Sequence, residues 1–161
     1  MNDNASSPPL LRYLWRNGIT LDDLVNTALE LFAPHPGVET REKAEALLRE
    51  EFLRILSDVN VSCLEIACFC LEKEAKEGNV PGLTKEIFTR GPGMVADEIL
   101  GMAIANYIAG SRGIFEYVRF DQRKPGILKK LGPIVNDAIG GLIAGVSANV
   151  YTKALERKSF T

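Results

Sequence analysis

Four carboxylates lie in apolar or small surroundings between Gly93 and Gly145, and they restrict the fold of this chain more than any other feature. Three short segments carry them: VADEILGM, RFDQRKPG and NDAIGGLIAG. A carboxylate among apolar side chains is costly unless a cation compensates it. We therefore expect the three segments to meet around one shared cation, and a hard divalent ion held by oxygen ligands suits such acids. The alternative is a helical domain whose acids are solvated in the ordinary way.

The composition is that of a chain with enough apolar residues to form one core. Of its 161 residues, 46% are hydrophobic and 25% are charged, and the formal net charge is -2. Because there is no basic tract and no cluster of basic and aromatic residues, we expect no nucleic-acid partner. The N-terminus lacks a signal-peptide pattern. The longest uncharged apolar run, residues 138–150, is shorter than the ~20 residues that span a bilayer, so we expect a cytoplasmic protein.

Apolar residues recur at helical spacing along most of the chain, and no hairpin signal appears. This pattern predicts an all-α fold, with a single compact domain of about six helices over residues 9–161 after a disordered lead of residues 1–8. Thr20 and Thr40 have the residue type and position of helix N-caps. Gly18 is expected just beyond the end of a helix, and Gly78 is expected to close the exposed end of another.

The second half of the chain predicts two further helices. The first covers residues 94 to about 109 and ends at Gly110, and a mixed segment follows it. Within that segment Lys124 precedes Pro125, so we expect an extended backbone at Lys124. The last helix is expected to begin near Pro133 and to end near residue 157.

The cysteines and the single histidine indicate structural rather than chemical roles. Three cysteines in a chain of cytoplasmic type argue against a disulfide framework. Cys63, Ala67 and Cys70 share a helix face, which predicts small buried thiols. His35 lies between two prolines and is expected to be an exposed loop residue.

The segment LLRYLWRNG, which contains Trp15 and two arginines, has two interpretations. As an amphipathic helix it would lie on the inner face of the membrane and make the protein peripheral. As a core helix it would pack Leu10, Leu11 and Leu14 inside the protein.

Two of the acidic segments predict helices with carboxylates on packed faces. Asp97 shares a face with Gly101, one turn further on, and Glu98 points about 100° away from it. Asp137 lies on a stripe of small residues that includes Gly141 and Gly145 and is widened by Gly140. Because helical glycine costs ~1 kcal/mol relative to alanine, such a stripe indicates close helix approach. The alternative places the acids in first turns, where the helix dipole favours them.

The third segment combines Asp121 with bases, among them Arg119 and Lys124, beside a Pro-Gly turn. Arginine and lysine bind phosphate oxygens well. If Asp121 faces the cation, these bases are placed to hold a phosphoryl group. The alternative is a surface loop of solvated charges.

Taken together, DExxGM (97–102), RFDxxKPG (119–126) and DxIGGxIAG (137–145) resemble the phosphatidylglycerophosphatase A family in order and spacing. The resemblance covers about residues 93–150, and the rest looks like the soluble, helical branch of that family. It implies a Mg²⁺-dependent phosphatase, with Mn²⁺ as a second candidate metal. The implied metal ligands are Asp97, Glu98, Asp121 and Asp137. The implied catalytic set is these four with Lys124, and the implied phosphate-binding residues are Arg119 and Lys124. Asn136 departs from the family pattern, which often has an acid at this position. The resemblance therefore does not decide whether the site holds one metal ion or two.

The predicted reaction is hydrolysis of a phosphomonoester, by attack of an activated water or through a carboxylate nucleophile. The family points to phosphatidylglycerophosphate, a lipid of phospholipid biosynthesis. Similar soluble enzymes look like α-ribazole-5′-phosphate phosphatases of cobamide synthesis, which is the alternative substrate. The non-enzyme alternative is a helical scaffold protein in which the glycine stripe packs subunits into a homo-oligomer.

Overall fold

The all-α prediction is confirmed by the computed structural model, which describes residues 6–90 and 94–159. Those residues form seven α-helices and one 3-10 helix, against the expected six or so, and no strand. The predicted disordered lead lies largely outside the described residues, since only residues 6–8 of it are described. In chain order the helices are α1 (Pro9–Arg16), α2 (Leu21–Glu30), α3 (Arg41–Ile55), α4 (Val59–Glu77), α5 (Lys85–Arg90), α6 (Ala96–Arg123), η1 (Gly126–Lys130) and α7 (Pro133–Ser159).

The predicted helix caps are present. Thr20 forms a capping box with Asp23: its hydroxyl accepts from the Asp23 backbone N–H at 3.1 Å, and the Asp23 carboxylate accepts from the Thr20 N–H at 2.8 Å. Thr40 accepts from the backbone N–H of Lys43 at 3.2 Å. Gly18 and Gly78 follow helix ends at φ angles of 80° and 78°. These caps depend on a few neighbouring residues, which is why the sequence predicts them.

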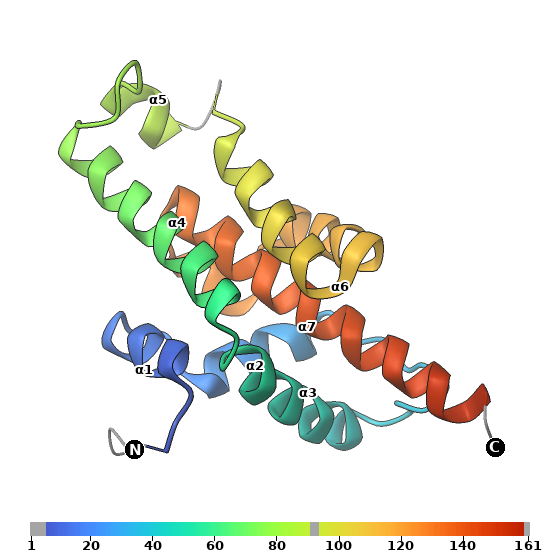
Figure 1. Cartoon of the computed structure of the whole chain (residues 1–161). Helices are drawn as coiled ribbons and strands as arrows, with labels where there is room; N and C mark the ends of the chain where they lie inside the picture. Colours follow the sequence, from blue (N-terminus) through green and yellow to red (C-terminus); the bar gives the residue numbers. More distant parts are fainter. Residues whose placement is uncertain (1–5, 91–93, 160–161) are drawn as a thin grey trace.

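Helix α7 is the centre of the molecule. It runs between α4 and α6 on one side and α2 and α3 on the other (Figure 1), and it packs against all four. Almost every side chain from residue 134 to residue 150 is buried. A helix that is apolar on all sides is buried on all sides, and residues 138–148 of α7 are apolar or small around the whole helix.

Helix α6 is folded back on itself at Gly110. The φ and ψ angles there are 60° and -148°, which are not helical and which favour glycine. A side chain at Gly113 would lie 2.2 Å from the carbonyl oxygen of Ala105, so the two halves of α6 touch closely. The predicted break at Gly110 is therefore confirmed, but the expected mixed segment is wrong: residues 111–123 are helical.

The glycines of α7 allow its close approach to α6, as expected. A Cβ atom at Gly141 would lie 2.2 Å from the carbonyl oxygen of Gly101, and one at Gly145 would lie 2.7 Å from Ile108. At Gly140 the nearest atom would be 3.7 Å away, an ordinary contact. Close packing therefore requires glycine at two of the three positions.

The predicted burial of the thiol face of α4 is wrong. Cys63 and Cys70 are exposed, and only Cys68 is buried. The inward face of α4 instead carries Val61, Glu65, Cys68, Glu72 and Ala75. In the sequence, Glu65 and Glu72 make this face look solvent-exposed rather than buried. Glu72 is buried because its carboxylate caps the start of α7, as described below.

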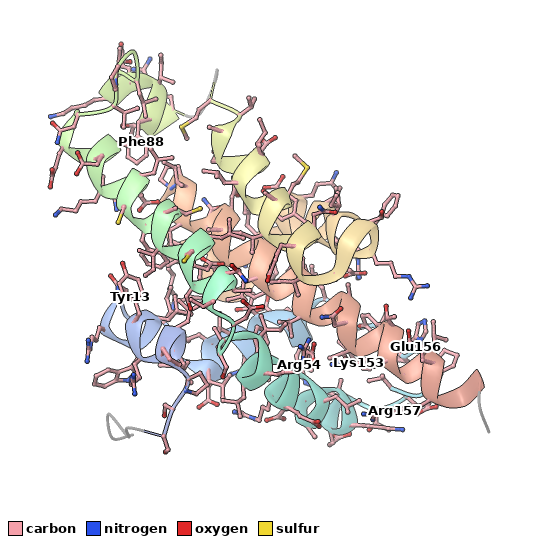
Figure 2. The ribbon with its side chains drawn as sticks, viewed as in Figure 1. Tyr13, Arg54, Phe88, Lys153, Glu156 and Arg157 are labelled. Carbon is pink, nitrogen blue, oxygen red and sulfur yellow. The ribbon has the colours of Figure 1, made fainter. Side chains whose placement is uncertain are left out.

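The leucines of α1 face the protein interior. Leu10 and Leu14 are 1% and 0% exposed, whereas Trp15 is 49% exposed. Of the two interpretations, the core helix is therefore the correct one. None of the described helices combines the length and hydropathy needed to cross a bilayer. Figure 2 labels Phe88 of α5, which is buried, and Lys153 of α7, which pairs with Glu51 of α3.

Candidate functional site

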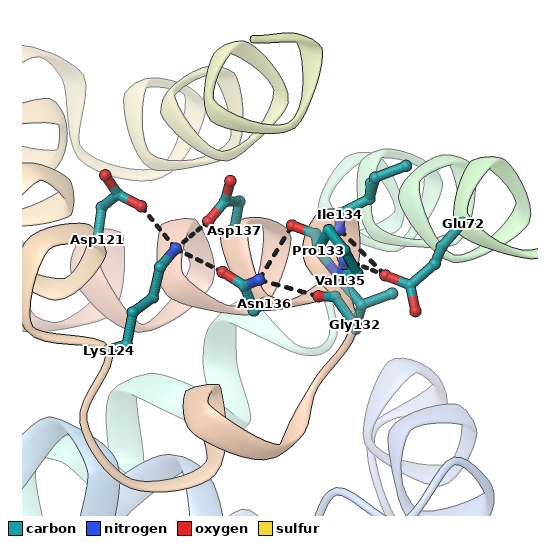
Figure 3. A network of polar contacts seen from close by, with 9 residues as sticks. All are labelled: Glu72, Asp121, Lys124, Gly132, Pro133, Ile134, Val135, Asn136 and Asp137. Atoms are coloured by element: carbon teal, nitrogen blue, oxygen red, sulfur yellow. Dashed lines mark hydrogen bonds and ion pairs between the residues drawn. The ribbon is translucent and has the colours of Figure 1, made fainter. Parts of the chain in front are cut away.

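The three acidic segments are brought together by the fold of α6 around α7. The first half of α6 passes α7 where Gly101 faces Asp137, and its second half returns to the same place, so that Tyr117 packs on Gly101. The end of α6 then lies beside the start of α7 (Figure 3). We call Asp97, Glu98, Asp121 and Asp137 the acid cluster.

Lys124 is the cation that joins two members of this cluster, Asp121 and Asp137 (Figure 3). Its ammonium nitrogen lies 2.6 Å from Asp121 Oδ1 and 2.5 Å from Asn136 Oδ1, and it also contacts Asp137 Oδ1. The Lys124 side chain is 34% exposed, the Asp121 side chain 27% and the Asp137 side chain 3%. One ammonium at the rim of the protein thus faces a buried carboxylate and a half-buried one.

The backbone of Lys124 is in the left-handed region, with φ 44° and ψ 53°, so the prediction of an extended residue is wrong. Proline disfavours the right-handed helical conformation in the residue before it, but the chain takes the left-handed one here. The Lys124 N–H donates to the carbonyl of Phe120 at 2.8 Å and closes the helix. Non-glycine residues pay for this conformation, and such strain recurs at functional sites. Here it accompanies a lysine side chain aimed at the acids.

Burial dominates the electrostatics of Asp137. It raises the pKa of this carboxyl to about 6, with the charges of Asp121 and Asp97 adding to the effect. The hydrogen bond and charge of Lys124 act in the opposite direction and lower the pKa. One ammonium therefore offsets only part of the negative charge that is concentrated here.

Tyr117 packs on Gly101 next to Asp137, and sequence reasoning missed it. Its pKa is raised by burial and then by the charges of all four acids, in the order Asp137, Asp121, Glu98 and Asp97. The hydroxyl is buried and has no hydrogen-bond partner among the described residues. The signal that would have found it is its position one turn before Asp121 on the same helix face.

Asp97 and Glu98 lie in the first turn of α6, where the helix dipole favours them, so the dipole interpretation describes their position correctly. Glu98 is exposed. Asp97 differs, because its Oδ1 atom is buried without a partner in the described part of the chain. A buried carboxylate oxygen without a hydrogen bond calls for an explanation that dipole stabilisation alone does not supply.

Arg119 does not join the cluster. It donates to the Glu116 carboxylate at 2.8 and 3.0 Å and to the carbonyl of Leu31 at 2.9 Å. Two positions along a helix correspond to about 200° of rotation, so Arg119 and Asp121 point in nearly opposite directions. The expected phosphate contact by Arg119 has no support in this geometry.

Glu72 of α4 holds the start of α7 in place (Figure 3). Its Oε2 atom accepts from the backbone N–H groups of Ile134 at 3.1 Å and Val135 at 2.8 Å. A Cβ atom at Gly132 would lie 2.0 Å from the Glu72 carboxylate, so glycine makes room for it. This contact spans 62 residues of sequence and positions the turn that carries Asn136 and Asp137.

The donors of the acid cluster match the oxygen preference of Mg²⁺ and Mn²⁺ in chemical type. Two buried atoms without partners, Asp97 Oδ1 and the Tyr117 hydroxyl, lie at the cluster and fit a missing ligand there. Across residues 6–90 and 94–159, however, no group of three or more His, Cys, Asp or Glu side chains has a geometry ready to hold a metal. The ammonium of Lys124 lies where the side-chain oxygens of Asp121, Asn136 and Asp137 converge.

Comparisons with known proteins give relatives but no stated activity. No protein-family model matches the chain. It is 39% identical over 118 residues to the uncharacterized protein MJ1330 of Methanocaldococcus jannaschii, a match that covers 70% of this chain and 90% of that protein.

Solved structures share the fold. A protein of unknown function from Bacillus stearothermophilus has 25% identity and a TM-score of 0.71, over 89% of this chain and 96% of that one. The low temperature requirement C protein from Listeria monocytogenes has 25% identity and a TM-score of 0.74, over 99% and 100%. Protein ypjQ from Bacillus subtilis, at 19% identity and a TM-score of 0.74 over 92% and 94%, shows the fold alone.

Proposed function

We propose that this chain, which belongs to the same family as the uncharacterized protein MJ1330, is a divalent-cation-dependent phosphatase that hydrolyses phosphate monoesters. The observation that carries the proposal is the meeting of Asp121 and Asp137 at Lys124, with Asp97 one helical turn before Gly101, which packs on Asp137. These acids come from three separate segments, and the same segments carry the resemblance to phosphatidylglycerophosphatase A.

The charge of the site supports a divalent cation. Asp121 and Asp137 meet at Lys124, the cation that lowers the pKa of the buried Asp137, and Asp97 adds further negative charge nearby. Asp97, Asp121 and Asp137 would hold Mg²⁺, with Asn136 as an uncharged oxygen ligand. When bound, Mg²⁺ would neutralise charge that develops on the phosphoryl group and lower the pKa of a coordinated water.

The exposure of Lys124 and Glu98 suits them to contact the substrate and the attacking water. Lys124, one-third exposed, binds an equatorial phosphoryl oxygen with its ammonium group and orients the ester. Glu98, exposed at the start of α6, accepts the proton of the attacking water. Asp137 must be ionised to act as a ligand, and its pKa of about 6 allows this at neutral pH.

Phosphatidylglycerophosphate is the proposed substrate, from the family resemblance. A second candidate is a water-soluble ester such as α-ribazole-5′-phosphate. The burial of Leu10 and Leu14 favours this second candidate, because it removes the leucine face that would otherwise contact a membrane.

The test is turnover of purified protein with Mg²⁺ or Mn²⁺ on phosphatidylglycerophosphate, α-ribazole phosphate and p-nitrophenyl phosphate. Asp97→Asn and Asp121→Asn should lower turnover by at least about 100-fold, because each removes a charged ligand. Asp22→Asn, which alters only an exposed pair with Arg49, is the matched control and should keep full turnover. Full turnover in either site variant would remove that residue from the mechanism.

A thermal melt separates the enzyme from the scaffold alternative. A cation that binds only the folded protein at 100 times its Kd adds ~2.7 kcal/mol to the unfolding free energy. If neither Mg²⁺ nor Mn²⁺ shifts the melt and no ester is hydrolysed, the phosphatase proposal fails and the scaffold interpretation replaces it.

A further inference from the structure

The ring of Tyr117 occupies a space that glycines leave open between the two halves of α6 and α7. A Cβ atom at Gly101 would lie 2.6 Å from its Cε2 atom and 2.8 Å from its Cζ atom. A Cβ atom at Gly140 would lie 3.8 Å from Cε2. Only 2% of the Tyr117 residue surface is exposed. The ring is therefore fixed by packing, and with it the position of the hydroxyl.

The hydroxyl is out of place in a purely structural role. It is buried, and none of the described residues offers it a hydrogen bond. A buried polar group without a partner costs about 1–3 kcal/mol. Phenylalanine would fill the same space without that cost, so packing explains the ring but not the oxygen.

The surroundings of the hydroxyl indicate what it can do. The hydroxyl end of the ring lies next to the acid cluster, because a Cβ atom at Gly101 would touch Tyr117 Cζ and would also lie 2.5 Å from the backbone oxygen of Asp137. Asp97, one turn before Gly101 on α6, is a hydrogen-bond acceptor when ionised and has a buried oxygen that is also without a partner among the described residues. A tyrosine hydroxyl carries its proton at neutral pH, so it can donate a hydrogen bond. A neutral donor can orient a carboxylate and leave its negative charge available to a bound cation. The ammonium of Lys124 is itself charged and competes with the cation for the carboxylate.

We propose that Tyr117 is a positioning residue of the acid cluster, whose hydroxyl donates a hydrogen bond to a carboxylate of the cluster when a divalent cation is bound. The proposal rests on the cation site of the proposed function, but not on the identity of the ester. Carboxylates that ligate metals are commonly hydrogen-bonded by such neighbouring groups, and loss of one typically lowers metal affinity 10–100-fold.

Tyr117→Phe in the full chain tests this directly. We expect the cation-free protein to melt at the same temperature as wild type or higher, because the deleted hydroxyl makes no bond in that state. Calorimetric titration should show Mg²⁺ and Mn²⁺ affinity reduced about 10-fold or more. The addition of Mg²⁺ should also perturb the tyrosine absorption spectrum of wild type, and Tyr117→Phe should lose that change.

Tyr107→Phe is the matched control on the same helix. The Tyr107 hydroxyl donates to Asp58 at 3.1 Å, away from the acid cluster, so this variant should keep wild-type cation affinity and the spectral change. Unchanged cation affinity in Tyr117→Phe would overturn the proposal, and so would a loss of cation-free stability as large as the loss of binding. Wild-type protein that binds neither cation also overturns it.

The two proposals fail in different ways. Protein that binds Mg²⁺ in a Tyr117-dependent manner but hydrolyses none of the esters contradicts the phosphatase proposal and supports the role of Tyr117. If the protein hydrolyses an ester and Tyr117→Phe keeps full cation affinity, the phosphatase proposal is supported and the role of Tyr117 is contradicted.

Discussion

The ammonium of Lys124 contacts the carboxylate of Asp137, 13 residues further along the chain, where the end of α6 meets the start of α7. The sequence led us to expect a divalent cation as the compensating charge and Lys124 as a ligand of phosphate. In the structure the lysine itself provides the compensation. Both roles use the same ammonium group, and the first experiment below removes it.

Lys124→Met should destabilise the protein. It leaves Asp137 buried without its cation, and because Lys124 is one-third exposed we expect a loss of about 1–3 kcal/mol of unfolding free energy, less than for a fully buried pair. Urea denaturation at neutral pH measures the change. Adding Asp137→Asn to Lys124→Met should recover part of the loss, since it removes the unpaired charge.

Lys43→Met is the control for that experiment. Lys43 pairs with Glu39 at 3.3 Å with both side chains about half exposed, and such pairs contribute about 0–1 kcal/mol. If the two lysine variants cost the same, the Lys124 network has no special electrostatic role.

Cation binding should strengthen as the pH rises through about 6. Burial raises the pKa of Asp137 to about 6, so below that pH the carboxyl is protonated and must lose its proton before it can ligate a cation. Mg²⁺ affinity measured by calorimetry between about pH 5 and about pH 8 should increase and then level off. An affinity that does not change across this range would show that Asp137 is not a ligand.

The titration of Glu65 should lower the unfolding free energy of the protein as the pH rises. Both carboxylate oxygens are buried with no hydrogen-bond partner in the described part of the chain, and burial raises the pKa of Glu65 from 4.5 to about 8. Below pH 4.5 the group is protonated in both the folded and the unfolded chain. Between those two values the unfolded chain releases the proton and the folded chain does not. Unfolding free energy should therefore fall by ~1.4 kcal/mol per pH unit across the window and level off above it.

Glu65→Gln and Glu65→Met separate the charge from the burial. Both variants remove the titration of Glu65, so urea unfolding between about pH 6.5 and about pH 8, above the pKa of about 6 of Asp137, should lose this slope. Glu65→Met should also be the more stable of the two, because it buries no unsatisfied amide. A slope that persists in Glu65→Gln would assign the pH dependence to another group.

Glu72→Ala should weaken the start of α7. The Glu72 carboxylate accepts from the N–H groups of Ile134 and Val135, which have no partners in their own helix, and loss of such a cap costs about 0.5–2 kcal/mol. Chemical denaturation measures the cost. Glu74→Ala, an exposed glutamate on the same helix, should change stability by less than about 0.5 kcal/mol.

Gly141→Ala and Gly140→Ala should differ although the residues are neighbours. A Cβ atom at Gly141 would lie 2.2 Å from a backbone carbonyl of α6, which cannot move aside, so we expect a loss of about 1–3 kcal/mol. At Gly140 the nearest atom would be 3.7 Å away, and alanine should be neutral or stabilising by up to ~1 kcal/mol. Equal thermal melts for the two variants would contradict the close packing of α6 on α7.

Local features of this protein could be predicted from the sequence because they depend on a few adjacent residues. Helical periodicity, the caps at Thr20 and Thr40 and the break at Gly110 are of this kind. The glycines of α7 likewise indicate close approach, since nothing else offsets their cost in a helix. Acids in apolar surroundings indicate a shared site for the same reason, since isolated burial is costly.

Only the tertiary structure decided which side chains share that site. The return of the chain after Gly110 turns Tyr117 and Lys124 toward the acids and Arg119 away from them, and a helical pattern does not specify that rotation. The packing of α4 on α7 likewise turned Glu65 and Glu72 inward and left Cys63 and Cys70 exposed. The sequence determined where most of the helices begin and end and that α7 approaches another helix closely. The rotation of each helix follows from contacts between residues far apart in the chain, whose free energies no local pattern contains.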